Sequence, residues 1–411
     1  MRQSKFFTKA VKELPKDETS FNAKELIRAG FVDKVAAGIY SFLPLGLKVH
    51  EKICQIVREE MDAIGGQEIS MPTLIPKESW ETTGRWKSFD VLFRLAGADK
   101  KEYGLGATHE EVITPLMKKF ISSYKDLPAA PYQIKTKFRN ELRAKAGLIR
   151  GREFSMKDMY SFHKDQKDLD DFYEVAIEAY FKIYKRLGLE KITYLTYASG
   201  GSFSKYSHEF QTLTEAGEDI IYICEKCRVA INKEIISEQK SCPKCGNKNL
   251  IEKKAVEVGN IFKLGNRFSK PFGLVYMDEK GEKQDVVMGC YGIGPSRLMG
   301  TIVEMNHDER GIVWPEEIAP FKVHFIEMKS KEAKVRQEAE KLYNDLTKKG
   351  VEVLYDDREN VSAGEKFAEA DLIGCPYRLV ISEKTLAENC VELKKRSDKE
   401  LKMVKISEIK F

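Results

Sequence analysis

The spacing of apolar residues predicts both helices and strands in the first three quarters of the chain. From Leu47 to Ile64 apolar residues recur at helical intervals and two glycines follow, which predicts a helix that ends there. A strand is expected directly after it, over 67–76, and a second long helix over Leu169–Leu187. We interpret Phe138 to His163 as two antiparallel strands joined by a basic loop.

The C-terminal part of the chain has a more regular order. After a linker at 314–320, the pattern predicts strand, helix, strand, helix and strand in turn, which is typical of a small α/β domain. The elements are expected at Phe321–Ile326, Lys331–Lys349, Val351–Tyr355, Gly364–Ile373 and Tyr377–Ile381.

Composition narrows the class of protein only slightly. The 411 residues are enough for two or three domains, and a net charge of +5 permits a nucleic-acid partner without requiring one. No apolar run reaches the length of about 18 residues that a membrane span needs, and the N-terminus lacks the apolar core of a secretion signal. Eight cysteines, four of them in two close pairs, favour a reducing cytoplasm over a disulfide framework.

Two Cys-x-x-Cys turns are the strongest chemical signal in the sequence, and they consist of Cys224 with Cys227 and Cys242 with Cys245. Each turn can place two thiolates on one tetrahedral ion, and together they complete a closed shell of four sulfurs. We interpret the segment as a small zinc ribbon, with iron as the other metal and free thiols as the alternative. Because a closed shell leaves no open position, the metal is expected to be structural.

The two expected strands of the hairpin carry groups that an adenine nucleotide needs. Arg139 and Glu141 lie two residues apart, so they would share one face of a strand. Phe154, Met156 and Asp158 would share a face of the next strand. These residues offer a stacking surface, an acceptor for an exocyclic amine and a cation. Further cations for phosphates come from the loop residues Arg143, Lys145, Arg150 and Arg152. A solvated amphipathic hairpin without a ligand is the alternative.

The segment around Thr108 allows two interpretations. Thr108 and Glu110 alternate as strand neighbours do, so a hydroxyl and a carboxylate can hold a cationic amine between them. Thr108 and Glu111 are also spaced as a capping box at the start of a helix. Both can hold, because Glu111 can cap the helix while Glu110 binds the amine.

Two glycine-containing segments complete the set of candidate sites. Gly292-x-Gly294-x-x-Arg297 begins like a dinucleotide-binding loop, but Pro295 and the missing third glycine argue against that. His208 follows a glycine-rich turn, and a single histidine without an identifiable partner is expected to be a wall residue rather than a catalytic base.

Several of these segments together resemble one family. Residues 138–141 and 152–154 match the Phe-Arg-x-Glu and Arg-Glu-Phe signatures of motif 2 of class II aminoacyl-tRNA synthetases. The longer run 152–163, with Thr-His-Glu-Glu at 108–111 and Gly-Cys-Tyr-Gly-Ile-Gly at 289–294, resembles the bacterial-type prolyl-tRNA synthetases. The resemblance extends over nearly the whole chain, with the motifs in family order.

This resemblance implies an α+β fold with a mainly antiparallel catalytic sheet of six or seven strands, a small zinc-ribbon insertion and a C-terminal α/β anticodon-binding domain. The implied boundaries are 1–220 and 255–318 for the catalytic domain, 221–254 for the insertion and 319–411 for the anticodon-binding domain. The expected helix 47–64 and the strand after it are similar to motif 1, the dimerisation element, so a homodimer is implied. Typical bacterial members hold a large editing domain where this chain has only the insertion.

The implied activity is the ATP-dependent attachment of L-proline to tRNA(Pro), in two steps through a prolyl-adenylate, without editing in cis. ATP would be a substrate, Mg²⁺ a cofactor and Zn²⁺ a structural ion, and no membrane would be involved. One alternative is another class II enzyme such as threonyl-tRNA synthetase, which binds its amino acid through a zinc with an open position. The other is a catalytically inactive RNA-binding relative, which the full set of ATP-contacting residue types argues against.

The resemblance also assigns roles to single residues. Arg139 would bridge the proline carboxylate and the α-phosphate of ATP, and Thr108 with Glu110 would hold the ammonium group. Arg297 would bind the γ-phosphate, and Glu257 would hold magnesium or the ribose, because a carboxylate is a hard ligand. Further ATP contacts would come from Glu141, Arg150, Arg152 and Phe154, the wall around the pyrrolidine from Met156, Phe162, His208 and Cys290, and the anticodon contacts from Arg358 and Lys366.

Overall fold

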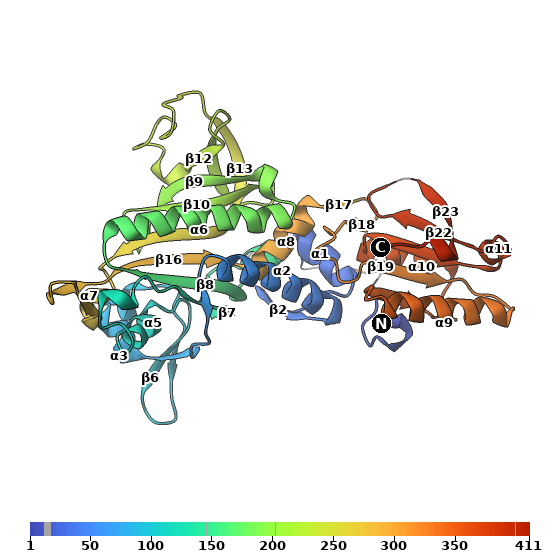
Figure 1. Cartoon of the computed structure of the whole chain (residues 1–411), viewed down its shortest axis with the longest axis horizontal. Helices are drawn as coiled ribbons and strands as arrows, with labels where there is room; N and C mark the ends of the chain where they lie inside the picture. Colours follow the sequence, from blue (N-terminus) through green and yellow to red (C-terminus); the bar gives the residue numbers. More distant parts are fainter. Residues whose placement is uncertain (12–17, 145, 202, 399) are drawn as a thin grey trace. The chain divides into compact units, whose positions relative to one another are not determined.

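A computed structural model describes residues 1–11, 18–144, 146–201, 203–398 and 400–411 (Figure 1). Lys145 of the expected basic loop lies outside the described residues, as does one serine of the glycine-rich turn before His208. The chain divides into two compact units. The large unit comprises Val35–Tyr40 and Ile53–Thr301, and the small unit comprises Met1–Lys34, Ser41–Lys52 and Ile302–Phe411.

The large unit is built on a nine-stranded sheet in the order β10-β9-β12-β11-β13-β16-β8-β7-β3. Neighbours are antiparallel except for β9 with β12 and β3 with β7, so the mainly antiparallel sheet is confirmed, with more strands than the six or seven expected. The strands are β3 (Gln67–Glu68), β7 (Pro131–Phe138), β8 (Glu153–His163), β9 (Thr193–Ser199), β10 (Tyr206–Leu213), β11 (Asp219–Cys224), β12 (Val229–Asn232), β13 (Ile251–Gly265) and β16 (Val287–Ile293).

Helix α6 (Gln166–Arg186) packs along one face of this sheet, as Figure 1 shows. It begins where the Asp165 side chain accepts the N–H of Asp168 at 2.8 Å, and its core face buries tyrosines such as Tyr180. The helix predicted over Leu169–Leu187 is therefore confirmed. Lys157 of β8 points to α6 and donates to the Tyr180 hydroxyl at 2.8 Å. Because side chains alternate along a strand, the neighbours of Lys157 point to the opposite face, away from α6.

The strand expected over 67–76 is instead two short strands in different sheets. β3 pairs with β7, whereas β4 (Leu74–Pro76) pairs with β6 (Glu102–Leu105). The ladder with β7 stops between them because the Met71 N–H is taken by the Gln133 side chain at 3.0 Å and Pro72 has no N–H.

Smaller elements complete the large unit. They are α3 (Lys77–Thr82), α4 (Arg85–Ser88), β5 (Arg94–Ala96), α5 (Glu110–Met117), α7 (Ser269–Phe272), β14 (Val275–Met277) and β15 (Lys283–Asp285). Elements divided between the units are β1 (Val32–Ala36), β2 (Ile39–Phe42), α2 (Pro44–Asp62) and α8 (Pro295–Met305). Helix α2 is the helix predicted from Leu47. No helix among the described residues is both long and apolar enough to span a membrane.

The segment 221–254, expected as a separate ribbon, is part of the large sheet. β11 pairs with both β12 and β13, β12 pairs with β9, and β10 pairs with both β9 and β13. These five strands therefore close into a ring. One end of it is filled by the apolar side chains of Ile221, Ile223, Ala230 and Ala255.

The small unit contains the predicted α/β domain. Its sheet has the order β20-β19-β21-β22-β23, and β19 runs parallel to β20 and β21. The predicted alternation is confirmed, and an antiparallel hairpin is added at the end. The elements are α1 (Phe21–Arg28), β17 (His307–Asp308), β18 (Gly311–Ile312), β19 (Val323–Glu327), α9 (Ala333–Lys348), β20 (Val353–Asp356), α10 (Ala363–Ile373), β21 (Tyr377–Ile381), α11 (Glu383–Ala387), β22 (Cys390–Lys395) and β23 (Leu401–Lys405).

Lys366 of the small unit does not lie where an anticodon contact requires. It is 2% exposed, and its ammonium donates to the backbone oxygens of Glu327 at 2.7 Å and Asp356 at 3.2 Å. The expectation of an RNA contact is therefore corrected for Lys366, which joins β19 to β20 instead. Arg358 is partly buried and pairs with Asp356 and Glu369, both at 2.8 Å.

Candidate active site

The face of the large sheet opposite α6 holds a cavity of about 310 Å³. Glu209 on β10, Asn260 on β13, Gly292 on β16 and Asp158 on β8 lie opposite one another on neighbouring strands, so they share this face. The cavity also brings together several of the residues predicted from the sequence, namely Thr108, Arg139, Phe154, Met156, Glu257, Cys290 and Arg297.

The predicted hairpin is formed by β7 and β8, with Gln133 opposite Asp158 and Lys137 opposite Phe154. The shared face of Phe154, Met156 and Asp158 is thereby confirmed. β7 ends at Phe138, however, so Arg139 and Glu141 do not share the face of a strand. The chain turns there, with the Glu141 N–H donating to the Arg139 carbonyl at 2.7 Å.

The loop residues that follow hold one another. Arg150 pairs with Glu141 at 2.9 Å and with Glu218 at 2.7 Å. Arg152 donates to the carbonyls of Glu141 at 3.0 Å and Ala37 at 2.9 Å. Glu141, Arg150 and Arg152 are not among the residues that line the cavity in the described part of the chain.

Arg139 and Arg297 give the cavity its positive charge. The Arg139 guanidinium lies over the Phe154 ring, 5.3 Å from its centroid, and its Nε has no hydrogen-bond partner. Burial, and then the nearby Arg297, lower its pKa. No carboxylate of the described residues lies within ion-pair distance of Arg139, so the site is suited to an anion. Arg297 is held by the Ile149 carbonyl at 2.8 Å and the Glu257 carboxylate at 3.3 Å.

Glu110 lies fully buried behind Thr108 and Cys290. Its carboxylate accepts from the Thr108 hydroxyl and from the Cys290 thiol at 3.4 Å. The guanidinium of Arg85 lies 3.2 Å from it and 3.0 Å from Glu111. The capping-box interpretation is wrong, because α5 begins after His109 without a side-chain cap and Glu111 binds Arg85 instead.

A second buried ion pair lies beside this cluster. Lys137 is 2.7 Å from Asp158, which also accepts from Gln133 at 3.1 Å and Tyr160 at 2.9 Å. Burial alone would raise the pKa of Asp158, but Lys137 and the neighbouring His109 hold it below its usual range. With Glu110, Glu111 and Arg85, the group contains three carboxylates and two cations. With all five groups ionised it carries one negative charge in excess, which a bound ammonium would balance. Burial raises the pKa of Glu111 to about 7, so this excess is complete only above neutral pH.

Glu209 stands on the same face without a cation of its own. Its carboxylate accepts from Asn232 at 2.9 Å and Gln211 at 2.8 Å. Burial, and the charge of Glu257, raise its pKa to about 8. Asn232 ends β12, and Glu234 just beyond it lines the cavity, so the segment 221–254 contributes directly to the cavity.

Two of the expected wall residues lie elsewhere. His208 precedes Glu209 on β10 and points to the α6 face, where its Nδ1 contacts the Tyr173 hydroxyl at 3.0 Å. Burial lowers the pKa of His208 to about 4, so the ring is neutral near pH 7. Phe162 is fully buried in the apolar core beside Tyr160. The expectation that these two side chains line the pocket is corrected, whereas Met156 and Cys290 do line it.

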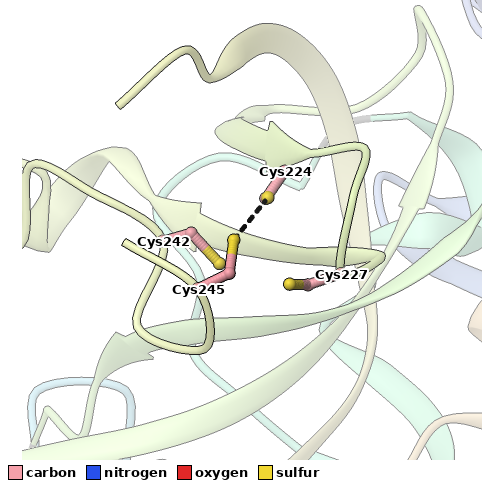
Figure 2. A group of neighbouring side chains, drawn as sticks. All are labelled: Cys224, Cys227, Cys242 and Cys245. Atoms are coloured by element: carbon pink, nitrogen blue, oxygen red, sulfur yellow. Dashed lines mark hydrogen bonds between the residues drawn. The ribbon is translucent and has the colours of Figure 1, made fainter. Parts of the chain in front are cut away.

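The four paired cysteines converge at the β11–β12 turn (Figure 2). One sulfur from each lies within 4.8 Å of the others, and the sulfurs of Cys224 and Cys245 are 3.7 Å apart. Asn247 donates to the Cys224 sulfur at 3.6 Å. All eight cysteines of the chain are free thiols. The arrangement can therefore present four thiolates to one ion.

Comparison with known proteins decides the family. Residues 93–306 match the profile described as tRNA synthetase class II core domain (G, H, P, S and T), and residues 322–410 match an anticodon binding domain. A proline–tRNA ligase from Wolbachia sp. subsp. Drosophila simulans (strain wRi) is 38% identical over 99% of this chain and 98% of its own length. This chain belongs to the proline–tRNA ligase family. The class II fold and the family implied by the motifs are confirmed.

Other proline–tRNA ligases differ from this one in length. The enzyme of Moorella thermoacetica is 32% identical over 97% of this chain and 96% of its own. That alignment runs over 551 positions against 411 residues here, whereas the Wolbachia alignment runs over 422. The Moorella enzyme therefore contains inserted residues that this chain lacks.

Solved structures support the fold. Prolyl-tRNA synthetase from Cryptosporidium parvum, complexed with halofuginone and AMPPNP, has a TM-score of 0.78 at 21% identity, over 94% of this chain and 75% of that one. The Giardia lamblia enzyme in complex with prolyl-adenylate has a TM-score of 0.77 at 21% identity, over 93% and 74%.

Three residues of this proline–tRNA ligase site were not found from the sequence. Arg85 gives no local signal, because its partners Glu110 and Glu111 are 25 and 26 positions away. Lys137 lies two residues before Arg139, and this strand-like spacing could have indicated that Lys137 belongs to the site. Glu209 lies beside the histidine that the sequence pattern favoured.

Proposed function

We propose that this enzyme joins L-proline to tRNA(Pro) in two steps through a prolyl-adenylate. The observation that carries the proposal is the cavity in which a half-buried Arg139 without an ion-pair partner lies with Arg297 and with the negatively charged group behind Thr108. The ammonium and the carboxylate of an amino acid have opposite charges, and this cavity offers a partner for each.

In the first step the proline ammonium binds at Thr108 and Glu110, next to Cys290 and Met156. Arg139 holds the proline carboxylate and the α-phosphate together for in-line attack and neutralises the charge that develops. No side chain has to move a proton in this step, because the attacking group is already an anion. The terminal ribose hydroxyl of the tRNA then attacks the carbonyl carbon of the adenylate, the bond to the phosphate breaks, and AMP leaves with the hydroxyl proton.

ATP is held by residues on the other side of Arg139. Phe154 stacks on the adenine and Arg297 binds the γ-phosphate. Glu141, with Arg150 and Arg152 behind it, reaches the adenine amine by a loop movement, since these three lie beside the cavity rather than in its lining. Glu257 suits Mg²⁺, because its carboxylate is a hard oxygen ligand on the cavity surface. The ion would supply positive charge to the leaving pyrophosphate.

The four cysteines hold a structural Zn²⁺. Two sulfurs that each lie 2.3 Å from one tetrahedral zinc are about 3.8 Å apart, close to the 3.7 Å between Cys224 and Cys245. A shell of four thiolates has no open position. This separates the enzyme from threonyl-tRNA synthetase, which uses a zinc to bind its amino acid.

The rest of the assignment follows the domain order. Residues 1–220 and 255–318 form the catalytic domain, with 221–254 inserted, and 319–411 bind the anticodon, with Arg358 as the remaining candidate contact. The enzyme acts as a homodimer in the cytoplasm.

Purified enzyme should exchange pyrophosphate into ATP when L-proline is present, without tRNA. Arg139→Ala should reduce the exchange rate at least about a thousandfold, because it removes the charge that stabilises the transition state. Arg310→Ala, which alters an exposed arginine of the small unit, is the control and should exchange normally. A higher rate with threonine than with proline would contradict the substrate assignment.

Arg85→Met should raise the KM for proline at least tenfold and leave the KM for ATP unchanged. Without the guanidinium, Glu110 and Glu111 face each other unscreened and share a proton, so Glu110 no longer offers the ammonium a full negative charge. The effect on KM should therefore shrink as the pH rises, which pH profiles of pyrophosphate exchange would reveal. Arg94→Met is the control, because Arg94 donates only to carbonyls such as that of Trp86. Equal effects of the two variants would rule out the proposed charge balance.

Purified protein should contain one zinc per chain, and Cys242→Ser should release it. Loss of the ion frees the turn at the end of β11, so hydrogen exchange in 221–254 should accelerate. Cys390→Ser, in the small unit, should retain the metal. Elemental analysis that finds no metal in protein purified under reducing conditions would end the zinc assignment.

The enzyme should activate alanine detectably and should not hydrolyse alanyl-tRNA. A pocket for pyrrolidine admits the smaller side chain, and each missing methylene costs it only about 1–3 kcal/mol. The segment that replaces the large insertion is occupied by the strands β11 and β12 and the metal turns, and it is too short to form a separate editing domain. Preformed alanyl-tRNA with the proline anticodon would be incubated with the enzyme. Deacylation well above the spontaneous rate would disprove the absence of editing.

A further inference from the structure

We propose that the metal turns form a docking surface for the acceptor arm of the tRNA. The surface, here called the knuckle, consists of the two Cys-x-x-Cys turns with Lys226, Lys240, Lys244 and Lys248. The inference rests on the proposed aminoacylation of tRNA, and it assigns to the segment 221–254 a task beyond holding its own fold.

Positive charge is concentrated in this segment. Residues 221–254 contain eight lysines and arginines and four glutamates, a balance of +4, whereas the whole chain carries +5. Four thiolates on one Zn²⁺ add two negative charges, but these lie at the centre of the knuckle. The lysine ammonium groups stand at its surface, where phosphates would meet them.

The metal site gathers the lysines in one place. Because the four sulfurs lie within 4.8 Å of one another, the two turns are side by side. Lys226 lies inside the first turn, Lys244 inside the second, and Lys240 and Lys248 flank the second. All four are exposed, and no carboxylate of the described residues lies within ion-pair distance of them. Lys167, an exposed lysine elsewhere on the large unit, is by contrast paired with Asp171 at 2.5 Å.

The knuckle is close to the place where the tRNA must react. Strand β12 leads from the first turn to Asn232, whose amide holds Glu209 at the cavity, and Glu234 lines the cavity as well. Four residues of a strand span roughly 10 Å. An RNA whose 3′ end enters the cavity therefore carries its phosphates past the knuckle, within about one Debye length of the lysines. In Figure 1 the loops beyond β12 and β13 project from the sheet at this end.

The chemistry of the surface identifies the kind of contact. Lysine ammonium groups bind phosphates as point charges and do not read base edges. The knuckle should therefore strengthen and orient binding of the acceptor arm without selecting its sequence, and it should act only in the step that uses tRNA.

The test replaces the four lysines together by alanine, as Lys226→Ala, Lys240→Ala, Lys244→Ala and Lys248→Ala. The control replaces four exposed lysines of the same unit, as Lys87→Ala, Lys101→Ala, Lys280→Ala and Lys283→Ala. The KM for tRNA and for a minihelix of the acceptor arm would be measured as a function of salt. One zinc per chain in each variant shows that the knuckle is intact.

The knuckle variant should raise the KM for both RNAs at least tenfold at low salt. The slope of log KM against log salt should fall by about 3.6, near 0.9 for each of the four lost phosphate contacts. Proline-dependent pyrophosphate exchange should stay at the wild-type rate, and the control variant should behave as wild type.

A KM within twofold of wild type would overturn the proposal. So would an equal rise in the control variant, which would mean a general charge effect, or a rise with tRNA that is absent with the minihelix. Failure of the proposed function is a distinct result, because wild-type enzyme would then lack proline-dependent exchange or tRNA charging altogether.

Discussion

The guanidinium of Arg139 lies in the cavity of the large unit without a carboxylate partner among the described residues. The arrangement of the other charges in the site depends on this free cation. Removing an unpaired charge even partly from water is unfavourable, so such a group persists only where the surrounding fold imposes it. Two buried cations behind the cavity each have a carboxylate: Arg85 has Glu110 and Glu111, and Lys137 has Asp158. The site is thus prepared for one anion at Arg139 and one cation at Glu110.

The sheet provides the rigidity that this arrangement needs. Glu209, Asn260, Gly292 and Asp158 lie in one row across four strands, and α6 packs on the opposite face with an apolar and tyrosine-rich surface. Functional groups on neighbouring strands keep fixed separations because the ladders hold them. The side chains of Glu141 and Arg150 are held by ion pairs with each other and with Glu218 rather than by a strand ladder, so they can adapt when ATP enters.

The sequence predicted what depends on neighbours along the chain. The alternation of Phe154, Met156 and Asp158, the long helix α6 and the pairing of the cysteines were all visible as local spacing. Contacts between distant segments were not. Arg85 pairs with residues 25 positions away, and no propensity or spacing carries that information.

The wrong predictions about which sheet face a side chain points to, and about which side chains are buried, also come from contacts between distant segments. His208 and Glu209 are adjacent, and only the register of β10 decides which of them points to the cavity. Lysine is usually a surface residue, but the ammonium group of Lys366 is buried and donates to two backbone carbonyls. The metal ribbon was recognised from its cysteines. Its incorporation into the sheet depends on the pairing of β12 with β9 and of β11 with β13, and the members of each pair are far apart in the sequence.

The closed ring of β9, β10, β11, β12 and β13 has a consequence for how the enzyme unfolds. A ring has no free edge strand, so none of its members can fray without breaking two ladders. Strand β13 continues into the catalytic sheet. The amide protons of β11, β12 and β13 should therefore exchange with solvent together, as one cooperative block. The segment 221–254 is therefore coupled to the catalytic fold. Local unfolding of this segment would also disrupt the ATP site.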